Sequence, residues 1–453
     1  MEKITLIKTV LSKSDFAYWS SILVNFGSAL AVIPIAYIYL NDAELALWFS
    51  MSLLVSISFF SDFGASLSVI RLSQYARTGW AKLPDYGAMS SQIAYKKEKN
   101  VQLYQEISNT SFKQTLKSNF LFVIVGLLIC FYFSEERAQS GISETTFYAI
   151  SGLYLLNIPI QNLSIFFSGL IQSQQNVFAA KIIDTIGGAA RIFFQLSIIY
   201  ITGDLFLFCL AHLLGSAVGL FMSSIYCFHK KYFYIDFKIK LKRDDLHKLS
   251  KYKNRQGLMA IGSFLILSSG PLIISNHPDP KLVSTFFLTA KIFAVLKNFS
   301  QVPILSVIPK LGILRASSEL AKMLLFFKSR SRFSLSIFFL GSLFILPFSQ
   351  NTHLVGMQEN LLLEPNLLIL MALIYLLELN HGNHAQLYLT KNHQPFLLPS
   401  LLSGIAILVL SLPASTYLGI FGLLLVQGIV QLAYNNWYPL YMNIRDLSTT
   451  RIF

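Results

Sequence analysis

Residues 177–201, VFAAKIIDTIGGAARIFFQLSIIYI, decide the fold class of this chain. At a rise of about 1.5 Å per residue, a helix over this run is long enough to span a bilayer. The run nevertheless contains Lys181, Asp184 and Arg191, which fall with Gln195 within roughly 80° of one another on a helix. A charged side chain at the bilayer centre costs at least about 2.5 kcal/mol. The pattern therefore predicts a transmembrane helix whose polar stripe faces protein or a watery cavity.

The composition places the whole chain among polytopic membrane proteins. Of its 453 residues 54% are hydrophobic and 13% charged, and the mean hydropathy is +0.56, whereas about 25% of residues are charged in a soluble domain. Cys130, Cys209 and Cys227 lie in or at the end of apolar runs without metal-ligand spacing. We therefore expect neither a disulfide framework nor a metal site.

Twelve apolar runs predict an all-α polytopic membrane protein, with 12 transmembrane helices in two six-helix halves around a central cavity. The third run has only 16 residues, so its helix is expected to begin inside the preceding loop. The first six spans are expected at 16–40, 45–70, 118–133, 146–171, 177–201 and 205–228. The second six are expected at 258–275, 282–309, 333–349, 366–390, 396–412 and 419–441.

A basic segment divides the two halves. We expect an N-terminal half over 1–228, a basic cytoplasmic linker over 229–257 and a C-terminal half over 258–453. In both halves a long basic connection follows the second span and a short polar turn follows the fourth. Such internal similarity suits a transporter made of two parallel repeats with a site between them.

The positions of lysine and arginine predict the orientation. Alternate connections, beginning with residues 1–15, hold 30 of the 36 Lys and Arg residues. By the positive-inside rule both termini are cytoplasmic in a multi-pass inner-membrane protein. The same bias explains the net charge of +14, so we expect membrane lipids, and not nucleic acid, as partners of these loops.

No pattern of an enzyme is present. The sequence contains no Gly-rich phosphate loop, GxSxG elbow or HExxH pattern, and the longest outward loop, Gln350–Asn366, is too small for a catalytic domain. We expect no catalytic residues and no cofactor.

Two spans carry cations at membrane depth. Lys181 either forms a structural pair with Asp184 or contributes to a substrate site, while Arg191 lies too deep to reach the surface and is expected to face a cavity. Lys291 and Lys297 on the eighth span are about 240° apart, so one of them can serve packing, and we expect Lys291 to face the cavity. Pro303 and Pro309 are expected to kink the end of that span; all four cations are candidate substrate ligands.

Two further spans carry polar stripes. Glu378, His381 and His384 fall on a face about 120° wide of the tenth span, where they form either a proton-coupling site or a structural hydrogen-bond network. Asn157 and Gln161 lie with two serines on one face of the fourth span, which suits sugar hydroxyls or helix packing. Counting Asp62 and Asp184 with Glu378 as the acidic groups, the intramembrane charge is slightly cationic, which favours an anionic substrate.

Residues 59–80, FFSDFGASLSVIRLSQYARTGW, resemble the corresponding region of bacterial O-antigen and polysaccharide flippases. These form the polysaccharide transporter family of the multidrug/oligosaccharidyl-lipid/polysaccharide exporter superfamily. ELALWFSMS at 44–52 is also similar to that family, whereas the connection 71–117 is longer than the family usually has. The matching residues are Asp62, Phe63, Gly64, Arg71, Tyr75 and Ala76.

The resemblance implies a flippase of lipopolysaccharide biosynthesis. Its substrate would be an undecaprenyl-pyrophosphate-linked oligosaccharide, the O-antigen repeat unit, moved from the cytoplasmic to the periplasmic leaflet by alternating access. Its partners would include a polysaccharide polymerase and a chain-length regulator. Asp62 and Arg71 would then form either a gate pair or a structural helix end. From their positions in the membrane spans, Asp184, Glu378, His381 and His384 are further candidate gating or coupling residues.

Two other functions compete with this one. A small-molecule or multidrug exporter of the same fold, coupled to H⁺ or Na⁺, is motivated by Glu378, His381 and His384. A membrane polysaccharide polymerase is disfavoured because no large outward loop with clustered Arg or His is present.

Overall fold

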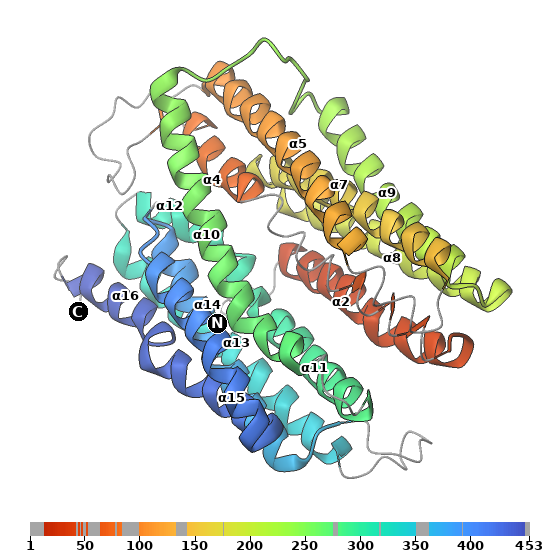
Figure 1. Ribbon diagram of the computed structural model, residues 1–453. Coiled ribbons are helices and arrows are strands. Elements are labelled where there is room, and N and C mark those ends of the chain that lie inside the picture. The colour runs from red at the N-terminus through yellow and green to blue at the C-terminus, as the bar shows by residue number, and fades with distance from the viewer. Residues whose placement is uncertain are drawn as a thin grey trace. The chain divides into compact units, whose positions relative to one another are not determined.

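The computed structural model describes most of the chain as helices (Figure 1). The described residues are 13–41, 44–45, 47–48, 51–52, 64–77, 79–83, 99–132, 143–174, 176–274, 280–316, 319–349, 362–391 and 393–448. Within them, every regular element is a helix and six helices are long and apolar enough to cross a membrane. The protein is therefore an all-α, multi-pass membrane protein. It divides into two compact units, and the boundary between them falls after Gly257.

The first unit contains most of the N-terminal half, from Phe16 to Gly257 apart from Tyr86–Ser90. Within it α7, α8 and α9 pack against one another, and α5 packs on α4 and α7. Its helices are α2 (Lys13–Tyr39, whose first turn belongs to the other unit), α4 (Ala65–Arg77), α5 (Val101–Tyr132), α7 (Glu144–Ser173), α8 (Val177–Thr202), α9 (Leu205–His229) and the start of α10.

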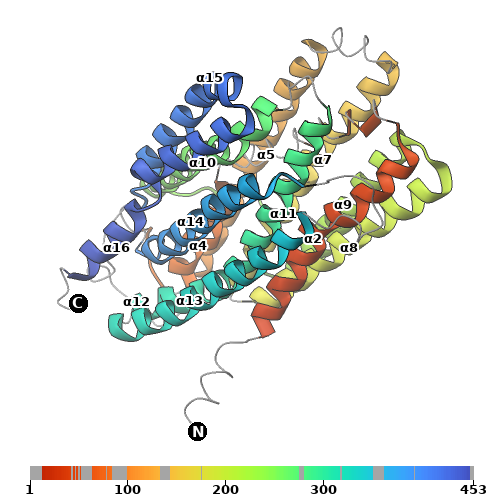
Figure 2. The ribbon, with the colours of Figure 1, turned by 90° about the horizontal axis from the view of Figure 1, so that it is seen from below.

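Short capped turns hold α7, α8 and α9 side by side (Figures 1 and 2). The Asn176 side chain accepts the Ala179 amide at the start of α8, and Asp204 accepts the Leu207 amide at the start of α9. Gly203 ends α8 with φ 61°, a left-handed conformation that glycine adopts without strain. These caps satisfy backbone groups that would otherwise remain unpaired at the helix ends.

Glycines bring α8 and α9 into close contact. A Cβ atom at Gly215 would lie 2.2 Å from Cα of Arg191, and one at Gly187 would lie 2.8 Å from Cα of Gly219. The Gly187–Gly188 pair therefore permits close packing inside a continuous helix and does not unwind it.

The second unit contains the described residues of Leu258–Phe453 together with the first turn of α2. Within it α11, α13 and α14 pack against one another (Figure 2). Its elements are the end of α10 (Arg243–Ile274), α11 (Pro280–Leu305), α12 (Ile308–Ala316), α13 (Leu320–Ile345), the 3₁₀ helix η3 (Leu346–Ser349), α14 (Pro365–Leu389), α15 (Leu397–Val430), the π-helix η5 (Gln431–Asn435) and α16 (Tyr438–Ser448).

Several helix boundaries differ from those expected. The third span begins at Val101, inside the preceding loop as anticipated, whereas α13 begins at Leu320, well before 333. Residues 243–257 of the predicted linker are helical because α10 begins at Arg243. These extensions contain charged and polar residues among their apolar ones, so they do not form the continuous apolar runs on which the search relied.

Backbone breaks occur at three positions marked by proline or glycine. α11 ends at Leu305 after Pro303, and α12 begins at Ile308, which confirms the kink expected there. The eleventh and twelfth spans are separated at Gly419, with φ 58° and ψ −143°. Most of the predicted second span lies outside the described residues; its described end begins after Gly64, where φ is 77°.

Candidate functional site

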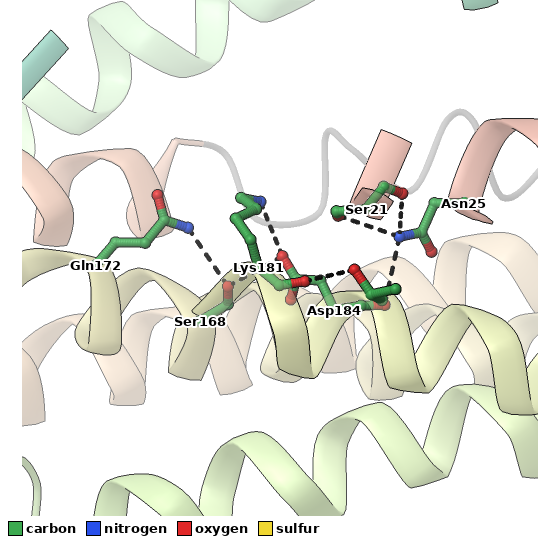
Figure 3. Close-up of polar contacts among 7 residues, drawn as sticks. Ser21, Asn25, Ser168, Gln172, Lys181 and Asp184 are labelled. Carbon is green, nitrogen blue, oxygen red and sulfur yellow. Dashed lines mark hydrogen bonds and ion pairs between the residues drawn. The ribbon is translucent and has the colours of Figure 1, made fainter. Parts of the chain in front are cut away.

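The first polar cluster surrounds an ion pair on α8 (Figure 3). Lys181 Nζ lies 2.8 Å from Asp184 Oδ2, one turn apart on the helix. The ammonium group also lies 4.9 Å from the ring centroid of Tyr18 on α2. The pair is mostly buried, with 17% and 21% of the two side chains exposed. An attractive ring face and a neighbouring carboxylate thus both stabilise the lysine charge.

Neutral side chains from α7 and α2 complete this cluster. Ser168 Oγ donates to Asp184 Oδ2 at 3.3 Å, and Gln172 Nε2 donates to Ser168 at 3.4 Å. On the other side, Asn25 Nδ2 donates to the backbone oxygens of Ser21 at 2.8 Å and Asp184 at 3.4 Å. Figure 3 shows these groups converging on one turn of α8. We call Tyr18, Asn25, Ser168, Lys181 and Asp184 the α8 cluster.

Arg191 extends the cluster along α8. Its Nη2 atom donates to Oδ1 of Asn25 at 3.1 Å. Among the described residues, no carboxylate forms an ion pair with it, so its charge is balanced less directly than that of Lys181. Asn25 therefore joins the backbone of Asp184 to the guanidinium group of Arg191, a role that the sequence analysis missed. An amide inside an apolar span was the available signal.

The predicted stripe on α7 divides into two parts. Ser168 contacts Asp184, as described above, while Asn157 is 1% exposed and neither of its amide atoms has a hydrogen-bond partner. Gln161 is half-buried on the same helix. A buried amide without a hydrogen-bond partner costs free energy of folding. Asn157 therefore remains a candidate ligand for a polar group.

The second polar cluster joins two helices of the other unit. Lys297 Nζ on α11 lies 2.9 Å from Glu378 Oε2 on α14, and 5.9 Å from the ring centroid of Tyr375. The side chains of the pair are 15% and 11% exposed. The structure thus pairs Lys297, and not Lys291, with the carboxylate; Lys291 is half-buried on α11. We call this group the α11–α14 pair.

The two histidines of α14 are held by separate partners. His381 Nδ1 lies 2.8 Å from the Asn435 carbonyl in the π-helix η5. Because a carbonyl only accepts, Nδ1 donates there and Nε2 is the acceptor in the neutral ring. His384 instead packs against the Phe327 ring at 5.2 Å, and its Nδ1 atom has no partner. Glu378, His381 and His384 therefore do not form one hydrogen-bond network.

The predicted gate residues lie largely outside what the structure describes. Asp62 is not among the described residues, and for Arg71 only the backbone, within α4, is described. The sequence analysis also missed two buried ion pairs. Arg330 Nη1 lies 3.2 Å from Asp15 Oδ2, with 4% and 0% of the side chains exposed, and Ser306 donates to the same carboxylate. Asp446 pairs with Arg315 at 2.7 Å and with Lys391.

These missed pairs occur where the search for apolar runs assigned cytoplasmic segments. Arg330 fell within 310–332 and was counted only as a topology signal, whereas Asp446, after the last span, was not considered. Two surface hollows, of about 460 and 410 Å³, are lined by other residues than those of either cluster. The predicted central cavity stays a prediction.

Comparison with known proteins identifies the fold. No family model matches the sequence, and no curated protein matches it significantly. The structure is similar to that of a mutant of the Vibrio cholerae MATE transporter VcmN, with a TM-score of 0.70 at 12% identity over 100% of this chain and 99% of the other. It is also similar to a second MATE protein, again solved as a mutant, with a TM-score of 0.70 at 12% identity over 96% of each chain.

A third similar structure shows an outward-facing multidrug resistance MATE family transporter of the MOP superfamily. Its TM-score is 0.65 at 13% identity, covering 97% of this chain and 96% of the other. At such identities the likeness establishes the fold alone. Two of these three proteins are named as transporters.

The expectation of an O-antigen flippase is wrong on this comparison. The similar structures are MATE transporters, and one of them is a multidrug resistance transporter. The structure also weakens the electrostatic argument for a pyrophosphate substrate. Lys181 and Lys297 are each paired with a carboxylate, so two of the four candidate cations are already neutralised and are less available to a pyrophosphate.

Proposed function

We propose that the protein is a secondary transporter that exports amphipathic small molecules in exchange for protons. The observation that supports this most is an ion-paired carboxylate in a candidate membrane span of each unit: Asp184 in α8 and Glu378 in α14. The fold shared with MATE transporters supports transport by the same two-unit architecture.

The proposed coupling rests on the chemistry of these pairs. Protonation of Asp184 or Glu378 removes the negative partner of a lysine at 2.8 or 2.9 Å. The lysine is then left uncompensated in a poorly solvated site, a state that favours rearrangement or proton release. A sodium ion would instead approach a carboxylate whose other side already carries an ammonium charge. Proton coupling therefore fits these sites better than sodium coupling.

We assign substrate contacts to polar side chains that do not form an ion pair. Arg191 donates to a neutral amide and Asn157 has no partner, so both can bind a polar group of a substrate without first breaking an ion pair. Apolar parts of the substrate would contact the surrounding aliphatic and aromatic side chains.

The test is export by living cells that lack their own multidrug exporters. Cells producing the protein are challenged with a panel of cationic, anionic and zwitterionic antibiotics and dyes, and growth and dye accumulation are measured. We expect resistance to at least one compound, at least a tenfold loss of it with Asp184→Asn or Glu378→Gln, and retention with the exposed control Lys322→Gln. Protection that persists in the carboxylate variants would contradict the coupling, and no protection against the panel would contradict the function.

A further inference from the structure

The segment between α9 and α10 is irregular, with turns at 230–231 and 237–238, and packs on α5. Gln105 Nε2 donates to the Tyr232 carbonyl at 3.3 Å, and Asn109 Nδ2 to the Tyr234 carbonyl at 3.2 Å. Lys113 Nζ donates to two further carbonyls of the segment, at 2.7 and 2.8 Å. The three donors are spaced four residues apart and so form one stripe along the helix. They satisfy backbone carbonyl groups that lie outside regular secondary structure.

Two other sets of contacts fix the same segment. Asn109 Oδ1 accepts the Asp236 amide at 2.9 Å, and Thr110 Oγ1 accepts the Leu241 amide at 3.4 Å. Phe233 is fully buried, with ring centroids of Phe112 at 5.5 Å and Phe166 at 6.0 Å. The backbone of this segment is therefore held in place by α5 and α7.

The fixed segment presents cations and apolar side chains together. Tyr234, Ile235 and Phe237 are 52%, 46% and 60% exposed. Around them, residues 230–243 carry six exposed basic side chains and a single acidic residue, Asp236. The exposed basic residues are Lys230, Lys231, Lys238, Lys240, Lys242 and Arg243. We call residues 230–243 the linker ledge.

The ledge lies at the level where membrane spans end. It connects α9 and α10, which are both candidate spans, and its buried Phe233 packs against Phe166 near the end of the candidate span α7. Aromatic side chains and lysines at this level match the interfacial zone of a bilayer, where rings sit among headgroups and cations meet lipid phosphates.

We propose that the linker ledge binds the headgroups of anionic phospholipids. The basic side chains contact the phosphate and glycerol oxygens, while Tyr234, Ile235 and Phe237 insert among the headgroups. Because α5 holds the backbone, binding orders few residues and the ledge acts as a preformed contact surface. Because this segment is one of the connections rich in Lys and Arg, the positive-inside rule places its surface at the cytoplasmic leaflet.

The experiment is native mass spectrometry of the full-length protein purified in detergent. Phosphatidylglycerol or phosphatidylcholine is added at equal concentrations, and retained lipid molecules are counted. The test variant is Lys238→Gln/Lys240→Gln/Lys242→Gln. The control is Lys322→Gln/Lys328→Gln/Arg332→Gln, which removes the same charge from exposed positions of α13. Thermal unfolding confirms that both variants are folded.

We expect the unaltered protein and the control to retain phosphatidylglycerol in preference to phosphatidylcholine. The ledge variant should retain at least threefold fewer phosphatidylglycerol molecules than the unaltered protein. Excess inorganic phosphate should not displace the lipid, because the apolar side chains contribute to binding. Equal retention by the ledge variant, equal loss in the control, or displacement by phosphate would each overturn the proposal. Recovery of a bound protein in place of lipid would overturn it as well.

Discussion

The two ion pairs of the membrane spans differ in what they connect. In the α8 cluster, Lys181 and Asp184 are neighbours on one helix and are joined to α2 and α7 by neutral groups. In the α11–α14 pair, Lys297 and Glu378 are 81 residues apart and lie on different helices. The first pair can break without any helix moving, whereas the loss of the second removes a direct connection between two helices.

Because of this difference, protonation of Asp184 and protonation of Glu378 should have different effects. At Asp184 it would alter local charge and the hydrogen bond from Ser168. At Glu378 it would also release α11 from α14 at this level. The comparison therefore predicts a larger conformational response in the second unit, and the variants below test it in order of decreasing effect on stability.

Removing one partner of the fully buried pair Arg330–Asp15 should cause the largest loss of stability among the ion pairs. Arg330→Gln removes the guanidinium group that lies 3.2 Å from the Asp15 carboxylate, which is 0% exposed. We expect a loss of about 3–5 kcal/mol, the usual consequence of removing one partner of a buried pair. Thermal unfolding in detergent measures this, with Lys322→Gln on the exposed Lys322–Glu319 pair as the control. Similar midpoints for the two variants would contradict the burial argument.

Lys297→Gln tests the connection between α11 and α14. It leaves Glu378 without a charge partner, and because this site is slightly less buried we expect about 2–3 kcal/mol of destabilisation. Adding Glu378→Gln should recover part of the unfolding midpoint without restoring transport. If the double variant is less stable than Lys297→Gln alone, the two side chains do not interact as described.

Gly215→Ala tests the close packing that positions Arg191. Its Cβ atom would lie 2.2 Å from the backbone of Arg191, so α8 and α9 must separate, at a cost of about 1–2 kcal/mol. Gly152→Ala in α7 is the matched control, because no atom lies within 4 Å of its added Cβ. That control should be neutral or slightly stabilising. Equal unfolding midpoints would show that α8 and α9 are not packed this closely.

Lys181→Gln should have the smallest effect on stability. The pair lies within one helix, and both side chains are about one-fifth exposed. Ser168 continues to donate to Asp184, so we expect a loss of about 1 kcal/mol, the smallest of the four variants. The same unfolding assay compares it with Lys297→Gln. A larger loss for Lys181→Gln would reverse the comparison between the two pairs.

The sequence could predict the parts of this molecule that depend on local pattern. The run 177–201 corresponds to α8 at Val177–Thr202, because a single apolar helix is visible in composition alone. The pairing of Lys181 with Asp184 was considered for the same reason, since both lie on one turn. Helical extensions such as Arg243–Gly257 were not predicted, because their polar residues resemble a loop.

Contacts between helices could not be derived in the same way. Glu378, His381 and His384 lie on one face of α14, as the periodicity predicts. Their side chains nevertheless contact three different elements: α11, η5 and α13. Periodicity gives the angle of each side chain about its own axis and not the rotation of its neighbours. For the same reason, charge counting could not show that Lys297 is neutralised by Glu378.

Proton-coupled transport by the purified protein tests the central claim most directly. The unaltered protein, Asp184→Asn and Glu378→Gln are reconstituted in vesicles, and a compound exported in the cellular assay is followed after a pH gradient is imposed. We predict uptake against its concentration gradient by the unaltered protein, collapse of uptake when a protonophore removes the gradient, and at least tenfold slower uptake in each variant. Uptake that ignores the pH gradient, or that survives in both variants, would contradict the account.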